Sequence, residues 1–410
     1  MKEPTIAKAA SSQAAGVLRR VDQVLADQGP GAAVDVVISA LDQAGEYRAL
    51  LDALLLRARL DLGLPLIAAG SLADLPEPAR TRFEERYIEA IRRVGERCLI
   101  AGDIPAAWTY LRTIGEEEPV ARAIREYQPD DDDERAGAVV EIAFNHGVEP
   151  VRGFELLLER YGACTAISAF EQAAPRDDQA RLACVERLIE RVHRDLVASL
   201  RADLASRGQA VPSDGARVAE LLAGREWLFA DDSYHIDVSH LAAVVRFAVV
   251  VKRPQALALA VDLADYGRRL SPRLRYESPP PFQDTFSDHY AYMEALLGRD
   301  VDGAVARFQA KLSDLEPGSD EVVFSAQTLV NLLVRVGRVG DAVEVAAAYL
   351  AGLPESALFC PNLAQLCEQA GMLPRLLEVA RGRGDLVGYT AARLALGRGD
   401  PNLRSSDPAV

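Results

Sequence analysis

Apolar residues recur at intervals of three and four along most of the chain, and charged residues fill the positions between them. This period places the apolar side chains on one face of an α-helix. It predicts helices at residues 17–25, 47–60, 83–100, 181–204, 241–251, 256–270 and 322–336. No pair of alternating segments indicates a β-hairpin, so the expected fold class is all-α.

The breaks between the predicted helices are mostly short and carry Gly, Pro or Asp, which favours antiparallel helical neighbours. Two breaks are longer. Residues 128–134 read QPDDDDE and residues 271–282 read SPRLRYESPPPF. Repelling carboxylates and consecutive prolines do not suit a helix interior, so both stretches are predicted to be loops. We place boundaries there and expect three helical segments at 1–128, 134–270 and 284–397.

One spacing of small residues and prolines recurs. A Gly is followed after five residues by Ala and after twelve more by Pro, in Gly337, Ala342 and Pro354 and again in Gly102, Ala107 and Pro119. The same order, with each interval one residue longer, occurs in Gly298, Ala304 and Pro317. A weaker unit begins at Gly371, thirty-four residues after Gly337, with Leu376 in place of the small residue.

This spacing resembles that of the tetratricopeptide repeat, a helix–turn–helix unit with a period of 34 residues. The resemblance covers residues 284–382 and 84–119, and more weakly 139–160 and 241–272. The large aromatic residues of the full family pattern are not met, so degenerate repeats and generic helical hairpins stay as alternatives. The resemblance implies antiparallel hairpins stacked as an α-α superhelix, either continuous or divided into two or three segments. Such arrays bind protein or peptide partners in a concave groove.

The resemblance also implies which residues face that groove, because the first helix of each unit lines it. With Gly337 as the marker, the facing residues are Phe324, Gln327, Asn331, Val334 and Arg335. Within this set, Gln327, Asn331 and Arg335 follow one another at four-residue intervals and form one polar ridge. The neighbouring units place Asp288, Tyr292, Gln365 and Gln369 on the same surface.

Side-chain amides beside a guanidinium suit recognition of a peptide carboxylate or backbone. The ridge is therefore predicted to bind a peptide segment. The alternative interpretation is an ordinary solvated stripe on a surface helix.

A second cluster suggests a different class of function. His235, Asp237 and His240 lie close together in the sequence, and His289 of another hairpin would complete a set of ligands for a divalent metal. The two neighbouring histidines are five residues apart, which does not place them on one helical face, and Asp237 also suits the N-cap of the following helix. A helical metal-dependent enzyme is therefore the alternative to an interaction module.

The net charge and the absence of known motifs make several classes of function less favoured. The 410 residues carry a net charge of −15, which argues against general binding to nucleic acid or to an anionic membrane surface. No phosphate-binding loop or nucleophile elbow is present, so no cofactor is expected and an enzyme is the less favoured class. The five cysteines form no C-x-x-C pair, and residues 1–13 lack the apolar core of a signal peptide. The expected address is the cytoplasm, and an oligomeric scaffold is a third possible role.

Overall fold

The structure is a computed structural model that describes residues 3–67, 75–213, 215–316 and 318–398. It divides into two compact units, residues 1–162 with 173–180 and residues 163–172 with 181–410. The all-α fold is confirmed, because helices that follow one another along the chain pack against each other in each unit. Within the described ranges the only strand-like pairing is an isolated bridge between Glu277 and Asp284.

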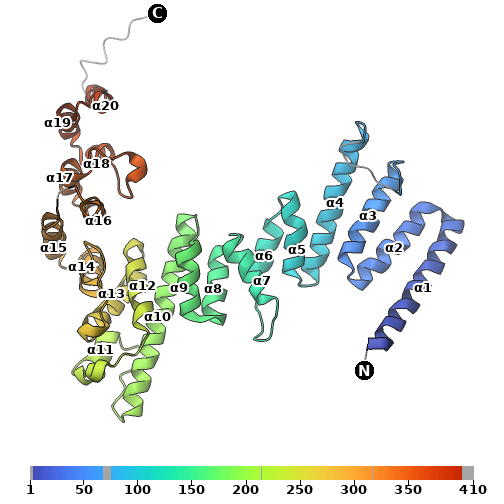
Figure 1. Ribbon diagram of the computed structural model, residues 1–410, viewed down its shortest axis with the longest axis horizontal. Coiled ribbons are helices and arrows are strands. Elements are labelled where there is room, and N and C mark those ends of the chain that lie inside the picture. Colours follow the sequence, from blue (N-terminus) through green and yellow to red (C-terminus); the bar gives the residue numbers. More distant parts are fainter. Residues whose placement is uncertain (1–2, 68–74, 214, 317, 399–410) are drawn as a thin grey trace, which may run out of the picture. The chain divides into compact units, whose positions relative to one another are not determined.

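The first unit is a succession of helices in chain order (Figure 1). These are α1 (Glu3–Gln28), α2 (Pro30–Ala44), α3 (Tyr47–Asp61), α4 (Ala79–Ile100), α5 (Ile104–Leu111), α6 (Glu118–Glu126), α7 (Ala136–Val140) and α8 (Pro150–Arg160). Short turns of 3-10 helix at Arg112–Ile114 and of π-helix at Glu141–Asn145 complete the set. Successive helices from α1 to α6 pack pairwise, which is the stacking expected of a helical repeat.

The second unit is also a succession of helices in chain order (Figure 1). Its helices are α9 (Gly162–Ala173), α10 (Asp178–Ser206), α11 (Val218–Leu222), α12 (Val238–Phe247), α13 (Pro254–Arg269), α14 (Thr285–Leu296), α15 (Val301–Ser313), α16 (Asp320–Arg335), α17 (Val339–Tyr349), α18 (Leu363–Ala370), α19 (Leu373–Arg383) and α20 (Leu386–Arg398). Turns of 3-10 helix lie at Glu226–Asp232, Ala248–Val250, Pro272–Leu274 and Glu355–Ala357.

The glycines that mark the repeat spacing stand where helices end. Gly337 follows α16 with φ 81°, and Gly371 follows α18 with φ 68°. Only glycine adopts this left-handed conformation without steric cost, so each helix stops there and the chain turns into its neighbour. Ala342 on the following helix is completely buried, as expected for close packing of the two helices. Pro317 lies outside the described residues.

Both predicted loops are non-helical connections, apart from the single turn Pro272–Leu274. Residues 128–134 lie inside the first compact unit, and residues 271–282 lie inside the second. The expected division of the chain into three segments stays a prediction.

The C-terminal helical pairs α14 to α19 share an apolar core. Its buried members include Phe308, Leu329, Leu333, Val343 and Leu366, one or more from each of α15, α16, α17 and α18. Because α16 contributes residues on several sides to this core, it lies between its neighbours and exposes only a narrow surface. None of the helices in the described ranges combines the length and apolar character needed to cross a membrane.

Candidate functional site

The candidate site is the narrow outer surface of α16 and the segment that crosses it. Residues 350–362, which join α17 to α18, are called the strap here. Gln327 of α16 is 3% exposed and meets the strap with both ends of its side-chain amide. Its Nε2 donates to the carbonyl of Ala357 at 3.3 Å, and its Oε1 accepts from the N–H of Phe359 at 2.6 Å. Gln327 therefore pairs with the main-chain groups on both sides of Leu358.

Asn331, one helical turn further on, extends the same contact. Its Nδ2 donates to the carbonyl of Phe359 at 3.2 Å, and its side chain is only half-buried. Beside it the rings of Phe324 and Phe359 lie 5.3 Å apart, a tilted arrangement that aromatic pairs favour. The two rings are 46% and 52% exposed. Phe324 and Phe359 are called the aromatic pair below.

Arg335, the third member of the predicted ridge, makes contacts of another kind. Its guanidinium donates to the carbonyls of Val249 and Val251, at the connection between α12 and α13. The Tyr292 side chain lies close to it, and burial lowers the pKa of the guanidinium below its ordinary value. Burial raises the pKa of Tyr292 to about 12. Arg335 and Tyr292 are therefore brought together, but as an internal contact that links α14, α16 and the α12–α13 connection.

Asp288 lies apart from the ridge. Its carboxylate is completely buried and accepts from Arg307 at 2.7 Å, from Lys311 at 2.8 Å and from the main-chain N–H of Asp284 at 2.9 Å. Both cations belong to α15, so Asp288 faces the second helix of its own pair. A buried carboxylate that is fully paired in this way stabilises the pair of helices.

The two glutamines of α18 that were predicted to face the groove do not join Gln327 and Asn331. Gln365 forms a capping box with Asn362, in which each side chain accepts from the other residue's main-chain N–H. Gln369 lies exposed on α18. The structure thus gathers Phe324, Gln327 and Asn331 on one surface and assigns other surroundings to the remaining predicted residues.

The repeat spacing does not predict the strap or its Phe359. The sequence holds one signal for the strap, which is the interval of residues 350–362 between two helices. That interval is long for a connection between stacked helices, and long connections often carry function. The aromatic residue in its middle was the second signal.

The residues of the metal alternative do not converge. His235 uses both ring nitrogens, one 3.0 Å from the Tyr266 hydroxyl and one 3.4 Å from Asp203 Oδ2. Asp237 caps α12 by accepting from the main-chain N–H of Ser239 and of His240. The hydrogen bond from the Ser239 hydroxyl, together with these N–H groups, holds the pKa of its carboxyl below the usual value.

His289 lies elsewhere, buried on α14 and stacked on Phe282 with ring centres 4.0 Å apart. Its Nδ1 donates to the carbonyl of Thr285 at 2.6 Å. Across the described part of the chain, no group of three or more His, Cys, Asp or Glu side chains is placed to hold a metal ion. The geometry gives no argument for the metal-dependent enzyme.

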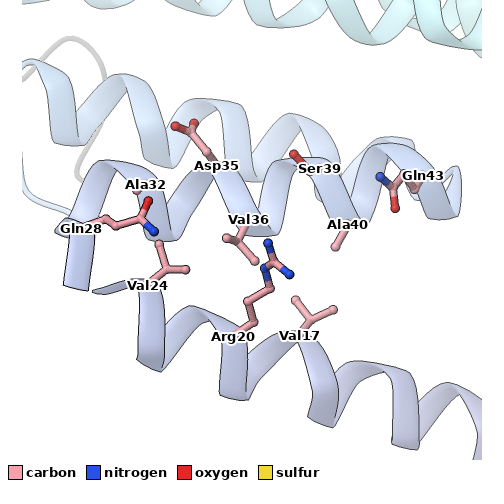
Figure 2. Close-up of a pocket in the computed structure, with 10 residues that line it drawn as sticks. All are labelled: Val17, Arg20, Val24, Gln28, Ala32, Asp35, Val36, Ser39, Ala40 and Gln43. Atoms are coloured by element: carbon pink, nitrogen blue, oxygen red, sulfur yellow. The ribbon is translucent and has the colours of Figure 1, made fainter. Parts of the chain in front are cut away.

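A groove of about 590 Å³ lies between α1 and α2 (Figure 2). Figure 2 shows Arg20 of α1 extended toward Val36 of α2, with Asp35 and Gln28 at the edge. The polar residues of this groove are open to solvent, and none is buried with an unmet hydrogen bond. The groove is therefore a hollow in the surface whose polar groups give no argument for a particular ligand.

The chain has also been compared with known proteins. No family model, curated protein or solved structure matches it. Arguments about its function therefore depend on its own geometry.

Proposed function

We propose that this chain is a protein-interaction module built from tetratricopeptide-like helical pairs, acting in the cytoplasm. The binding surface is formed by the aromatic pair and Asn331. The partner is a protein segment in extended conformation. The main support for the proposal is the contact of Gln327 and Asn331 with main-chain groups of the strap. In this contact, side-chain amides of α16 form hydrogen bonds with a peptide backbone.

The aromatic pair supports the same proposal. Two neighbouring phenylalanines that are each about half-exposed are costly to leave in water, and exposed aromatic side chains are enriched where proteins meet partners. Asn331 lies next to them with part of its amide accessible, so it can add a directed hydrogen bond at the edge of the apolar contact. The acidic net charge disfavours nucleic acid as the partner.

Site-specific photo-crosslinking in the source cell tests the proposal. A benzophenone amino acid is introduced at position 324, and at position 276 as the matched control. Tyr276 is an aromatic residue of similar exposure, 47%, on the connection between α13 and α14. We expect a specific protein adduct at position 324 that disappears when Phe359→Ala is added. Identical adducts at 324 and 276, or adducts that persist in Phe359→Ala, would refute the proposed surface.

A further inference from the structure

The aromatic pair is bordered by carboxylates that no cation of the chain neutralises. Asp320 and Glu321 lie in the first turn of α16, four and three residues before Phe324, so they are its neighbours on the helix surface. Glu355 lies four residues before Phe359, in the short turn of the strap. All three carboxylate side chains are exposed, and within the described part of the chain none of them forms an ion pair.

The hydrogen bonds of the fold leave these carboxylates available to a partner. Ser319 caps α16 by accepting from the N–H of Val322, so neither acid of the first turn serves as the cap. Acids at this end of a helix also interact favourably with its dipole, but that interaction leaves the solvent side of each carboxylate free. The carboxylate of Glu355 accepts one hydrogen bond, from the neutral amide of Asn362 at 3.3 Å, which does not compensate its charge.

The sequence supplies few cations to this surface. Between Lys311 and Arg375 it holds eight Asp or Glu residues and only two cations, Arg335 and Arg338. The guanidinium of Arg335 donates to main-chain carbonyls at the connection between α12 and α13. The guanidinium of Arg338 pairs with Asp302 at 2.9 Å and with a second carboxylate of α17. The negative charge beside the aromatic pair is therefore not balanced from within.

The faces of the aromatic pair are also uncovered by any cation. Elsewhere the chain places its own guanidinium groups over rings, as Arg59 does over Phe83, 5.0 Å from the ring centre, and Arg268 over Tyr290 at 4.1 Å. Among the described residues, no such cation covers either ring of the aromatic pair, although both rings are about half-exposed. The face of an aromatic ring is electronegative, so a cation from a partner is attracted to it.

We infer that the partner segment is cationic and carries arginine side chains that pair with Glu321 and Glu355 and pack over the aromatic pair. Arginine suits both contacts, because its planar guanidinium binds carboxylates with two donors and stacks on aromatic faces. The inference rests on the proposed function and specifies the charge of its partner. The strap stays in place as part of the surface, since Leu353 and Leu358 pack against the C-terminal core.

Photoreactive peptides test the charge of the partner. Each is an acetylated and amidated octapeptide of Gly and Ser with one leucine, one benzophenone residue and two variable positions. These positions hold arginine, its neutral isostere citrulline, or glutamate. The host is the full chain, and adducts are located by mass spectrometry. We expect the arginine peptide to label residues 320–331 and 354–362 about 5-fold more than the citrulline peptide, because each exposed ion pair changes binding about 2- to 3-fold.

A host with Glu321→Gln and Glu355→Gln should reduce the advantage of arginine over citrulline to less than about 2-fold, as should about 1 M salt in the unaltered chain. The matched control carries Glu117→Gln and Glu126→Gln, which remove two exposed carboxylates of the other compact unit, and it should keep the full advantage. All hosts are checked for equal thermal stability.

Several results would overturn the inference. These are equal labelling by the arginine and citrulline peptides, a preference for glutamate, adducts confined to other regions, or no adduct with any peptide at millimolar concentration. An undiminished advantage of arginine in the Glu321→Gln/Glu355→Gln host would overturn it as well.

The two proposals fail separately. The cellular crosslinking at position 324 is repeated with Glu321→Gln and Glu355→Gln. If a specific adduct forms there and persists in this variant, while the peptides show no preference for arginine, the module stands and the cationic partner is wrong. If the arginine peptide labels the surface as expected but nothing crosslinks in the cell, the charge preference stands and the proposed cellular function is wrong.

Discussion

Helices α14 and α16 are the first helices of two successive pairs, and both carry polar residues that the repeat pattern assigns to one groove. In α14 the carboxylate of Asp288 is buried against two cations of α15. In α16 the Gln327 side chain is nearly as buried, but its amide pairs with the main chain of the strap. One polar group joins two helices of the array, and the other holds a segment that runs across the array.

The difference shows that the partner of a buried polar group decides its role. A carboxylate attracts Arg307 and Lys311, which have long side chains and come from a helix that is part of the core. An amide pairs well with a peptide group, because each offers one donor and one acceptor. The same face of a repeat can therefore stabilise the fold in one pair and bind a segment in the next.

The largest expected effect is on α14. Asp288→Asn removes the charge that Arg307 and Lys311 share, and we expect a loss of about 3 kcal/mol in the local unfolding free energy of α14 and α15, measured by amide hydrogen exchange. The control is Asp302→Asn, since Asp302 is 98% exposed in its pair with Arg338 and should cost less than about 0.5 kcal/mol. Equal effects of the two substitutions would remove the structural role of Asp288.

Acid should weaken α14 more than α16. Burial lowers the pKa of His289 to about 4, whereas an unfolded histidine titrates near 6.5. Because the unfolded state then binds the proton first, His289 lowers stability as the pH falls from about 6.5 toward 4. Linkage gives a loss of roughly 2 kcal/mol by pH 5.

His289→Leu provides the matched comparison for this pH effect. The measurement is the difference in unfolding free energy between pH 7 and pH 5 in the variant and in the unaltered chain. The difference should be smaller in the variant by about 2 kcal/mol. An unchanged pH dependence would show that His289 takes up its proton as readily in the fold as in the unfolded chain.

A middle-sized effect is expected in α16. Gln327→Ala leaves the N–H of Phe359 and the carbonyl of Ala357 without their partners, at a cost of about 1–2 kcal/mol. The loss should appear as faster exchange of strap amides, while the helix amides of α16 change little. Gln369→Ala, an exposed glutamine on α18, should change stability by less than about 0.5 kcal/mol. Loss of helix protection in Gln327→Ala would make Gln327 equivalent to Asp288.

The smallest effect concerns the aromatic pair. A double-mutant cycle of Phe324→Ala and Phe359→Ala should give a coupling energy of about 0.5–1 kcal/mol, because both rings are half-exposed. Chemical denaturation of the four proteins measures it. A coupling of zero would show that the two rings do not stabilise each other.

The fold class, the main helices and most helix ends could be predicted from the amino-acid sequence. This was possible because these features are local. The apolar residues at intervals of three and four in 322–336 predict which side of α16 is apolar. Gly337 and Gly371 adopt a left-handed conformation that is unfavourable for most other residues, so they mark helix ends. Asp237 as a helix cap is local in the same sense, since its hydrogen bonds reach only two and three residues forward.

The contacts of the candidate site could not be predicted in this way, because they join residues that are far apart in the sequence. Gln327, Asn331 and Arg335 are equally spaced on one ridge, but the first two meet residues 357–359 and the third meets Val249 and Val251, more than eighty residues away. The spacing of residues along a helix determines which way their side chains point. Which residue each side chain contacts depends on how distant segments pack against that helix. For a buried polar group that distant partner determines the energy, so its role follows from the fold and not from its spacing.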